Sequence, residues 1–322
     1  MASLLSVENL QVQFQTKKGI NTAVDGVSFS VEKGRILGIV GESGCGKSVT
    51  SMSILQLLGS NARISGGSIK LDGKELIGLP EKEMCRIRGN DIAMIFQDPM
   101  TALNPTLTIG TQLMEPIMLH QNCGKKEAWT RAVDVLKRVG IAAPEKRMKE
   151  YPHQLSGGMR QRVIIAMAVS CEPRLLIADE PTTALDVTIQ AQILELMCEL
   201  REKMGTAIML ITHDMGVVAE TADDVLVLYA GKAVEYGSIE DIFERPKHPY
   251  TQGLLNSIPR LDEDVELLNT IEGTVPAPDA MPAGCRFAPR CPYGKDRCMK
   301  EKPGVYHAGN SLVSCFRYEG EK

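Results

Sequence analysis

Residues 41–48 read GESGCGKS and match the pattern G-x-x-x-x-G-K-S. They stand between an apolar run at 35–40, which predicts a buried strand, and a segment at 47–58 with helical spacing. Glycines let backbone N–H groups wrap phosphate oxygens, and the helix presents its positive end to the same anion. We therefore expect Lys47 to reach the β- and γ-phosphates of a nucleotide and Ser48 to bind Mg²⁺. The alternative is a glycine-rich turn that binds nothing. The candidate nucleotide-binding residues are Gly41, Glu42, Ser43, Gly44, Cys45, Gly46, Lys47 and Ser48.

A second group of candidate residues follows the apolar run 175–178, where two acids end the segment LLIADE. Strand ends in parallel sheets open onto the ligand crevice. Asp179 is placed to hold Mg²⁺ through water, and Glu180 to polarise an attacking water. Two adjacent acids at a strand end are alone a weak signal, but they gain weight from the phosphate loop earlier in the chain.

The segment LSGGM at 155–159 predicts another anion-binding helix terminus, because a serine and two glycines begin a long helix. The competing interpretation is a helix start capped by Ser156. His213 follows the apolar strand 208–211, where an imidazole could hydrogen-bond a phosphate oxygen. A lone histidine in that position is more often structural.

The elements that position these residues indicate an α/β fold. Apolar alternation over 4–31 predicts antiparallel strands, whereas residues 107–169 are mainly helical in pattern. Later apolar runs alternate with helical stretches, which is typical of a mostly parallel sheet covered on both faces. We expect a cassette over 1–255 with a helical subdomain at about 100–170, then a linker and a small cysteine-rich module over 256–322.

Composition narrows the class of protein. The chain has 322 residues, 43% of them hydrophobic and 24% charged, with a formal net charge of -4, so no basic field indicates nucleic acid as a partner. The longest purely apolar run is 163–169, whereas a bilayer span needs about 20 residues. No basic residue precedes Lys17, so we expect no signal peptide, and the nine cysteines favour metal binding over disulfides.

Taken together, the motifs resemble those of ATP-binding cassette (ABC) ATPases. The phosphate loop, LSGGM, LLIADE, TALD at 183–186 and THD at 212–214 occur in that family's order, although Met159 stands where the family's LSGGQ has glutamine. The resemblance implies ATP hydrolysis by two cassettes paired head to tail, with each signature segment capping the ATP held by the other cassette. The signature residues would be Leu155, Ser156, Gly157, Gly158 and Met159.

The same resemblance implies further roles. Gln97 would lie near Mg²⁺ and the attacking water, His213 would sense the γ-phosphate, and Asp186 would lie in the loop joining the two sites. Phe14 would stack on adenine, although a core phenylalanine in a strand is an equal alternative.

Two strings narrow the resemblance to importers. QDPMTALNP at 97–105 and HPYTQGLL at 248–255 are similar to segments of dipeptide and oligopeptide importer ATPases, a group that includes nickel and some sugar importers. This implies an ATPase on the cytoplasmic face of a bacterial cell membrane. Its partners would be an identical or related ATPase subunit, two transmembrane permease subunits and, indirectly, an extracytoplasmic substrate-binding protein. The region 97–115 would form the groove for a permease helix.

Two other classes stay open, a stand-alone cassette ATPase and an iron–sulfur electron carrier with an idle nucleotide site. Repair-type cassettes carry a long coiled coil, but the segment between Lys47 and Asp179 has no sustained heptad. Translation-type cassettes carry two phosphate loops, and this chain has one.

Four cysteines cluster near the C-terminus, with gaps that do not fit paired zinc knuckles. Importer ATPases of the similar family can carry a [4Fe-4S] cluster in this region, with Zn²⁺ or unmetallated thiols as alternatives. The candidate ligands are Cys285, Cys291, Cys298 and Cys315. A fifth cysteine, Cys45, lies beside a helix N-terminus, where a thiol pKa tends to fall, so we expect it to react with alkylating reagents.

Overall fold

The computed structural model describes residues 3–17, 19–97, 102–183, 186–258, 270–277 and 280–320. The chain forms two compact units, each discontinuous in sequence. The first comprises Met1–Val31, Ile36–Ile77 and Ile211–Lys322, and the second comprises Glu32–Arg35 and Gly78–Leu210.

A four-stranded sheet forms the N-terminal part of the first unit, in the order β2-β1-β4-β5. β1 pairs antiparallel with β4, and Val7 lies opposite Ile69 with both side chains buried. The alternating pattern over 4–31 therefore predicted β1 and β2 correctly, because every second side chain faces the core. The strands are β1 (Ser3–Thr16), β2 (Gly19–Glu32), β4 (Ala62–Leu71) and β5 (Lys74–Glu75).

The first unit also contains a row of strands in the order β11-β12-β10-β9-β3. β3 runs parallel to β9, and β10 continues the sheet antiparallel to β9. Two short C-terminal strands complete the row, because β12 pairs with β10 and β11 pairs with β12. The cysteine-rich segment thus shares a sheet with the strand that leads into the phosphate loop. The bounds are β3 (Ile36–Val40), β9 (Asp224–Tyr229), β10 (Lys232–Ser238), β11 (Tyr306–Ala308) and β12 (Ser311–Val313).

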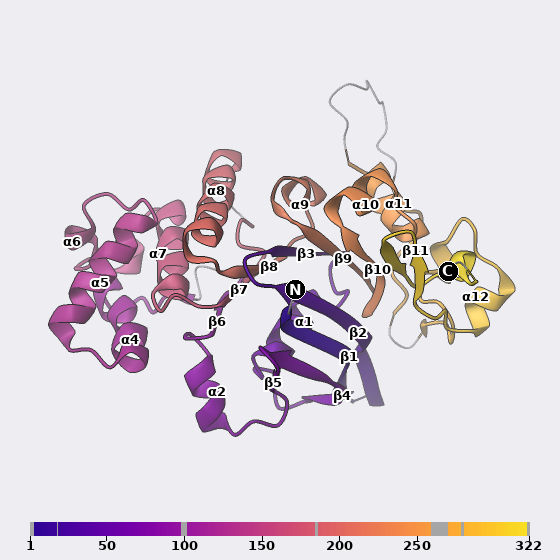
Figure 1. Ribbon diagram of the computed structural model, residues 1–322, viewed down its shortest axis with the longest axis horizontal. Helices are drawn as coiled ribbons and strands as arrows, with labels where there is room; N and C mark the ends of the chain where they lie inside the picture. Colours follow the sequence, from indigo (N-terminus) through magenta and orange to yellow (C-terminus); the bar gives the residue numbers. More distant parts are fainter. Residues whose placement is uncertain are drawn as a thin grey trace. The chain divides into compact units, whose positions relative to one another are not determined.

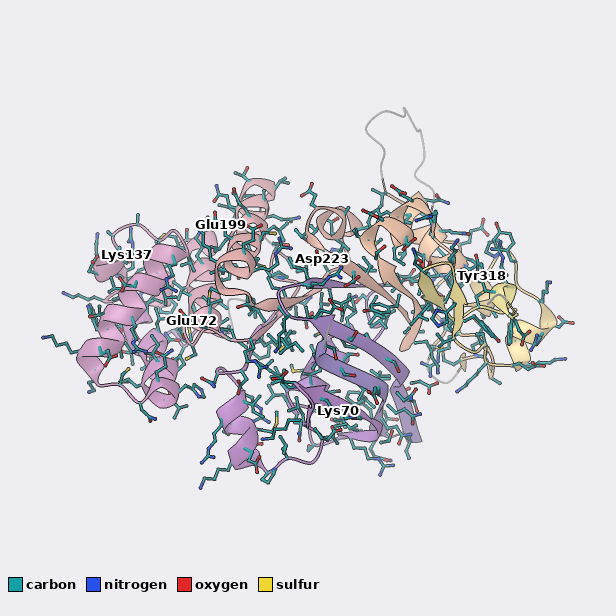
Figure 2. All side chains as sticks on the ribbon, viewed as in Figure 1. Lys70, Lys137, Glu172, Glu199, Asp223 and Tyr318 are labelled. Atoms are coloured by element: carbon teal, nitrogen blue, oxygen red, sulfur yellow. The ribbon has the colours of Figure 1, made fainter. Side chains whose placement is uncertain are left out.

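Short helices accompany this sheet. The carboxylate of Asp223, labelled in Figure 2, accepts the N–H of Ile36 at 2.7 Å and ties the start of β3 to the turn before β9. The helices are α1 (Lys47–Ile54), α9 (Met215–Thr221), α10 (Ile239–Glu244), α11 (Pro249–Asn256) and α12 (Asp296–Lys300).

Helix α1 is shorter than the sequence pattern predicts. The apolar spacing continues to Leu58, but the helix ends at Ile54 because Gln56 adopts a left-handed conformation with φ of 49°. The N–H of Leu57 donates to the carbonyl of Met52 at 2.9 Å, and the N–H of Gln56 donates to that of Ser53 at 3.1 Å. These two bonds form a Schellman motif, which satisfies the last carbonyls and stops the helix.

The second unit contains strands in the order β8-β7-β6 and a group of helices. Ile92 of β6 pairs in parallel with Leu175 of β7, and all five residues of β7 are buried. Figure 1 shows α4, α5, α6 and α7 grouped together, as the helical pattern of 107–169 predicts. The strands are β6 (Ile92–Ile95), β7 (Leu175–Asp179) and β8 (Ala207–Ile211). The helices are α2 (Glu81–Ile87), α4 (Ile109–Gln121), α5 (Lys125–Arg138), α6 (Pro144–Arg147), α7 (Gly157–Val169) and α8 (Val187–Met204).

Several charged side chains of the second unit are exposed. Lys137, Glu172 and Glu199 are about half exposed or more and project from the second unit (Figure 2). Within the described residues, no helix combines the length and the apolar character needed to cross a membrane.

Candidate functional site

The phosphate loop connects β3 to α1 in the first unit. Gly41 has a φ of 151°, and a Cβ at this position would lie 2.1 Å from the carbonyl oxygen of Leu228. Only glycine therefore lets the loop leave β3 so close to β9. Lys47 is 6% exposed, and its Nζ donates to the carbonyl oxygens of Gly41 at 2.7 Å and Glu42 at 3.2 Å. The loop thus combines a cation, glycine backbone and a helix N-terminus, which suits a phosphate group.

The expectation that the helix terminus lowers the pKa of the Cys45 thiol is wrong in its direction. Cys45 is 2% exposed, and burial raises the pKa of its thiol despite the nearby ammonium of Lys47. Desolvation disfavours the thiolate more than the local positive charge favours it. Sequence position alone could not show this burial, because it comes from packing around Gly41.

Glu42 receives two contacts from the C-terminal part of the first unit. Its N–H donates to the hydroxyl of Tyr250 at 2.9 Å, and its carboxylate accepts from Nη1 of Arg290 at 2.9 and 3.1 Å. Sequence reasoning assigned no role to either partner, although Tyr250 belongs to the HPYT string. Tyr250 is fully buried and packs edge-on against Tyr229, with ring centroids 4.7 Å apart.

His248, which begins the same string, has a structural role. Its Nδ1 accepts the N–H of Tyr250 at 3.1 Å and caps α11. Complete burial lowers the pKa of the imidazole to about 3, so the ring stays neutral and keeps this acceptor. The carboxylate of Glu235 accepts the N–H groups of Lys247 at 2.7 Å and His248 at 2.8 Å, which fixes the entry to the helix.

The second unit brings two predicted residues into contact at the end of β7. Nε2 of Gln97 donates to Oε2 of Glu180 at 2.8 Å, and Oγ1 of Thr183 donates to the same oxygen at 3.0 Å. Asp179, the preceding residue, is buried. Glu180 itself has a φ of 47°, a conformation that is costly for a residue with a side chain and is common at functional sites.

Gln161 on α7 is a residue that sequence reasoning missed. It is buried, and its Nε2 donates to the carbonyl oxygen of Pro181 at 2.5 Å. This bond holds the backbone directly after Glu180. The only signal available in the sequence was its position on the helix that the LSGGM segment begins.

The LSGGM segment starts α7 with an exposed turn. Leu155 is buried, whereas Ser156 and Gly157 are exposed, and the hydroxyl of Ser156 accepts the N–H of Met159 at 3.4 Å. A Cβ at Gly157 would meet no heavy atom within 4 Å, and one at Gly158 would lie 3.1 Å from Ile189. The packing of the chain itself thus gives no steric reason for glycine at Gly157.

The remaining predicted residues lie in both units. Asp186 caps α8 by accepting the N–H of Ile189 at 3.0 Å, while Ala184 and Leu185 lie outside the described residues. His213 is exposed between β8 and α9, and Phe14 is half-buried on β1 opposite Ala62. Within the QDPMTALNP string, residues 98–101 also lie outside the described part of the chain.

The four C-terminal cysteines line one small cavity of about 80 Å³. None is in a disulfide, and burial raises the pKa of the Cys285 thiol to about 11. Across the described ranges, no group of three or more His, Cys, Asp or Glu side chains is arranged to hold a metal ion. The structure therefore brings together the cysteines that the sequence predicted as a set, without the geometry of a single-ion site.

Comparisons with known proteins follow the two parts of the sequence. Residues 24–183 match the ABC transporter family, and residues 234–298 match the oligopeptide/dipeptide transporter C-terminal region. The chain is 56% identical to the oligopeptide transport ATP-binding protein AppD of Bacillus subtilis, over all of this chain and 98% of the relative. It is 51% identical to the oligopeptide transport ATP-binding protein OppD of Escherichia coli, over 98% of this chain and 93% of the relative.

Among solved structures, the chain is similar to the post-hydrolysis dimer of the ATP-binding cassette MJ0796 bound to ADP and phosphate. The TM-score is 0.66 at 27% sequence identity, and the match covers 73% of this chain and 98% of the other. The α/β cassette fold predicted from the sequence is thereby confirmed.

Proposed function

Since this chain belongs to the ABC transporter family, in its branch of oligopeptide and dipeptide transport ATP-binding proteins, we propose that it hydrolyses ATP to drive peptide import through a membrane permease. The contact between Gln97 and Glu180 is the observation that carries the mechanism, because it orients a carboxylate directly after a buried strand.

The first unit binds the phosphates in this proposal. Lys47 turns from the loop carbonyls to the β- and γ-phosphates, and loop N–H groups and the start of α1 stabilise the same charge. Ser48 is exposed at the first turn of α1, where its hydroxyl can ligate Mg²⁺. When bound there, Mg²⁺ would supply positive charge to the phosphate oxygens. His213 hydrogen-bonds the γ-phosphate, and Phe14 stacks on adenine.

The second unit supplies the hydrolytic groups. Glu180 accepts a proton from the attacking water, and the amide of Gln97 holds the carboxylate and the water in line with the phosphate. Asp179 supports Mg²⁺ through water. The bond from Gln161 to Pro181 keeps this turn in place.

Two chains pair on ATP, and each presents residues 155–159 to the nucleotide of the other. The exposure of Ser156 and Gly157 at the positive end of α7 supports this arrangement. Asp186, at the start of α8, lies in the loop between the two sites. The partner is an identical or a related ATPase subunit, and the pair docks two permease subunits through the region 97–115 on the cytoplasmic face of the cell membrane. An extracytoplasmic binding protein delivers the cargo.

The division into a cassette over 1–255 and a C-terminal module over 256–322 is part of the proposal. Within that module we propose a [4Fe-4S] cluster held by Cys285, Cys291, Cys298 and Cys315. Four free thiols around one cavity fit its ligand set, and a cluster needs room between its thiolates. Ligation would stabilise a short segment that has little core of its own.

Anaerobic purification tests the cluster. We expect a brown protein with bound iron and sulfide, and we expect Cys291→Ser to lose the iron while Cys198→Ser, a cysteine of α8, retains it. A colourless protein with one equivalent of zinc would support the Zn²⁺ alternative instead.

Glu180→Gln in the purified transporter complex tests hydrolysis. The amide cannot accept a proton, so turnover should fall about a hundredfold or more while ATP binding persists. Glu199→Gln, an exposed glutamate of α8, is the matched control and should keep the parent rate. Robust hydrolysis by the Glu180 variant would reject the assigned base.

Cargo is tested separately, by mass analysis of the ligand on the co-purified binding protein. Peptides are the expected cargo, and nickel or an oligosaccharide is the alternative within this group. Failure to recover any permease with the chain would favour a stand-alone cassette.

A further inference from the structure

The phosphate loop carries an acidic side chain, Glu42, beside the residues proposed to bind the phosphates of ATP. A carboxylate in this position opposes phosphate binding by like-charge repulsion unless a cation compensates it. The Nζ of Lys47 is directed to other groups: it donates to the backbone carbonyls of Gly41 and Glu42 and lies 3.9 Å from Sγ of Cys45.

The compensating cation comes from Arg290, which lies at the end of a short 3-10 turn, Ala288–Arg290. Its side chain is 6% exposed, and Nη1 donates to both carboxylate oxygens of Glu42, at 3.1 and 2.9 Å. Charge-assisted bonds of this kind are stronger than neutral ones, and burial reduces their screening by solvent.

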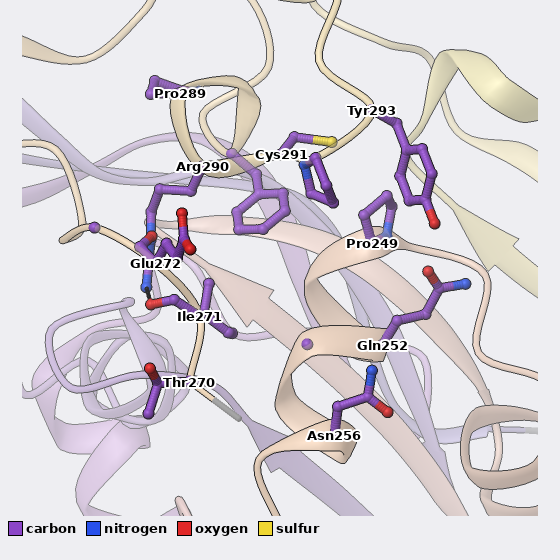
Figure 3. Close-up of a pocket in the computed structure, with 14 residues that line it drawn as sticks. Pro249, Gln252, Asn256, Thr270, Ile271, Glu272, Pro289, Arg290, Cys291 and Tyr293 are labelled. Atoms are coloured by element: carbon purple, nitrogen blue, oxygen red, sulfur yellow. Dashed lines mark hydrogen bonds between the residues drawn. The ribbon is translucent and has the colours of Figure 1, made fainter. Parts of the chain in front are cut away.

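The guanidinium is anchored on its other side by backbone. Nε donates to the carbonyl oxygen of Glu272 at 3.0 Å, and Nη2 donates to that of Ile271 at 3.2 Å (Figure 3). Nη1 also lies 3.4 Å from the hydroxyl of Tyr229. These contacts orient Arg290 toward the loop, so its position is set by the C-terminal part of the chain.

An aromatic cluster connects the same turn to the loop backbone. Phe287 is buried against Tyr229 and Tyr250, with ring centroids 5.1 and 5.4 Å apart. The hydroxyl of Tyr250 accepts the N–H of Glu42, so that amide is already bonded within the protein. Both the charge and the backbone of Glu42 are therefore held by residues distant in sequence.

We propose that Arg290 is a positioning residue for ATP binding, which neutralises Glu42 and holds the phosphate loop so that the C-terminal module sets the affinity for nucleotide. The inference rests on the proposed role of the phosphate loop. It assigns the module an effect on the nucleotide site through a direct ion pair, in addition to any structural role.

A double-mutant cycle on the full-length chain tests this proposal, with a fluorescent ATP analogue and Mg²⁺ as the probe. Arg290→Ala should weaken binding roughly tenfold when Glu42 is present. In the Glu42→Gln background the same replacement should weaken binding less than about threefold, because no carboxylate remains to repel the phosphates. Arg290→Lys keeps the charge and should retain most of the affinity.

Thermal unfolding separates this role from a purely structural one. Arg290→Ala loses its bonds to Ile271 and Glu272 in both backgrounds, so the chain should lose stability in both. Its affinity for the analogue should fall clearly only where the Glu42 carboxylate is present. Arg297→Ala is the matched control, because this arginine of the same module pairs with Glu301 and Glu319. It should bind the analogue as the parent does.

Equal weakening in both backgrounds, or unchanged binding by Arg290→Ala, would overturn the proposal. Lys47→Ala distinguishes this failure from failure of the proposed function. If Lys47→Ala binds the analogue as tightly as the parent, the phosphate-loop assignment itself is wrong. If it loses binding and the Arg290 cycle shows no coupling, only the present inference fails.

Discussion

Gly157→Ala tests whether this glycine is needed for the stability of the fold or for ATP-dependent dimerisation. A Cβ at Gly157 meets nothing within 4 Å, and the residue is the first of α7. Alanine is a better helix former than glycine, by up to about 1 kcal/mol in a helix interior. The free energy of unfolding should therefore stay constant or rise by at most that amount, and the melting temperature should not fall.

ATP-dependent pairing should nevertheless fail in this variant. In the proposed dimer the glycine lets α7 approach the partner's γ-phosphate closely. The added methyl group would push α7 away from that phosphate. We expect ATP hydrolysis by the transporter complex to fall at least about tenfold, as when an enzyme loses one backbone contact to developing charge. Light scattering in the Glu180→Gln background should show monomers with ATP present.

Gly124→Ala is the matched control for this experiment. Gly124 precedes α5 and lies outside the proposed site, and a Cβ added there would also meet no heavy atom within 4 Å. It should hydrolyse ATP as the parent does. A Gly157 variant with full activity would refute the close approach, and one that is markedly less stable would show that the chain's own packing requires the glycine.

Two further predictions concern the phosphate loop. Gly41→Ala should destabilise the protein by about 3 kcal/mol or more, because its Cβ would lie 2.1 Å from the Leu228 oxygen. Gly44 has a φ of 77° and open surroundings, so Gly44→Ala should cost only about 1 kcal/mol of backbone strain. Urea unfolding measures the loss of stability in both variants. Cys45 should react with iodoacetamide far more slowly than the exposed Cys85, and its rate should rise about tenfold per pH unit up to its raised pKa, as followed by mass spectrometry of labelled peptides. Rapid labelling of Cys45 at neutral pH would contradict the burial of its thiol.

The sequence predicts the parts of the site that are encoded by contiguous residues. The phosphate loop and the segments at 155–159 and 175–180 are short strings whose chemistry depends on local geometry, a strand end or a helix start. The family resemblance placed Gln97 near Mg²⁺ and the attacking water. Its hydrogen bond to Glu180 was not predicted, because the two residues are distant in sequence and no periodicity pairs them.

Contacts that depend on the packing of remote segments were missed. Arg290 and Glu42 are 248 positions apart, and no local sequence pattern around either residue indicates that the two are in contact. The pKa of Cys45 was predicted in the wrong direction for the same reason, since the helix terminus is visible in the sequence and the burial is not. The end of α1 was misplaced because a left-handed Gln56 lacks the glycine that usually marks such a stop.

The pairing of β12 with β10 has a consequence for any shortened form of this protein. β12 covers Glu235 and Tyr236 of β10, whose other side is bonded to β9. Deleting the C-terminal residues would expose unpaired backbone groups along β10. An unpaired edge strand of this kind forms hydrogen bonds with strands of other molecules. A truncated ATPase core would therefore tend to self-associate, and a soluble minimal version should retain the chain at least through Val313, the last residue of β12.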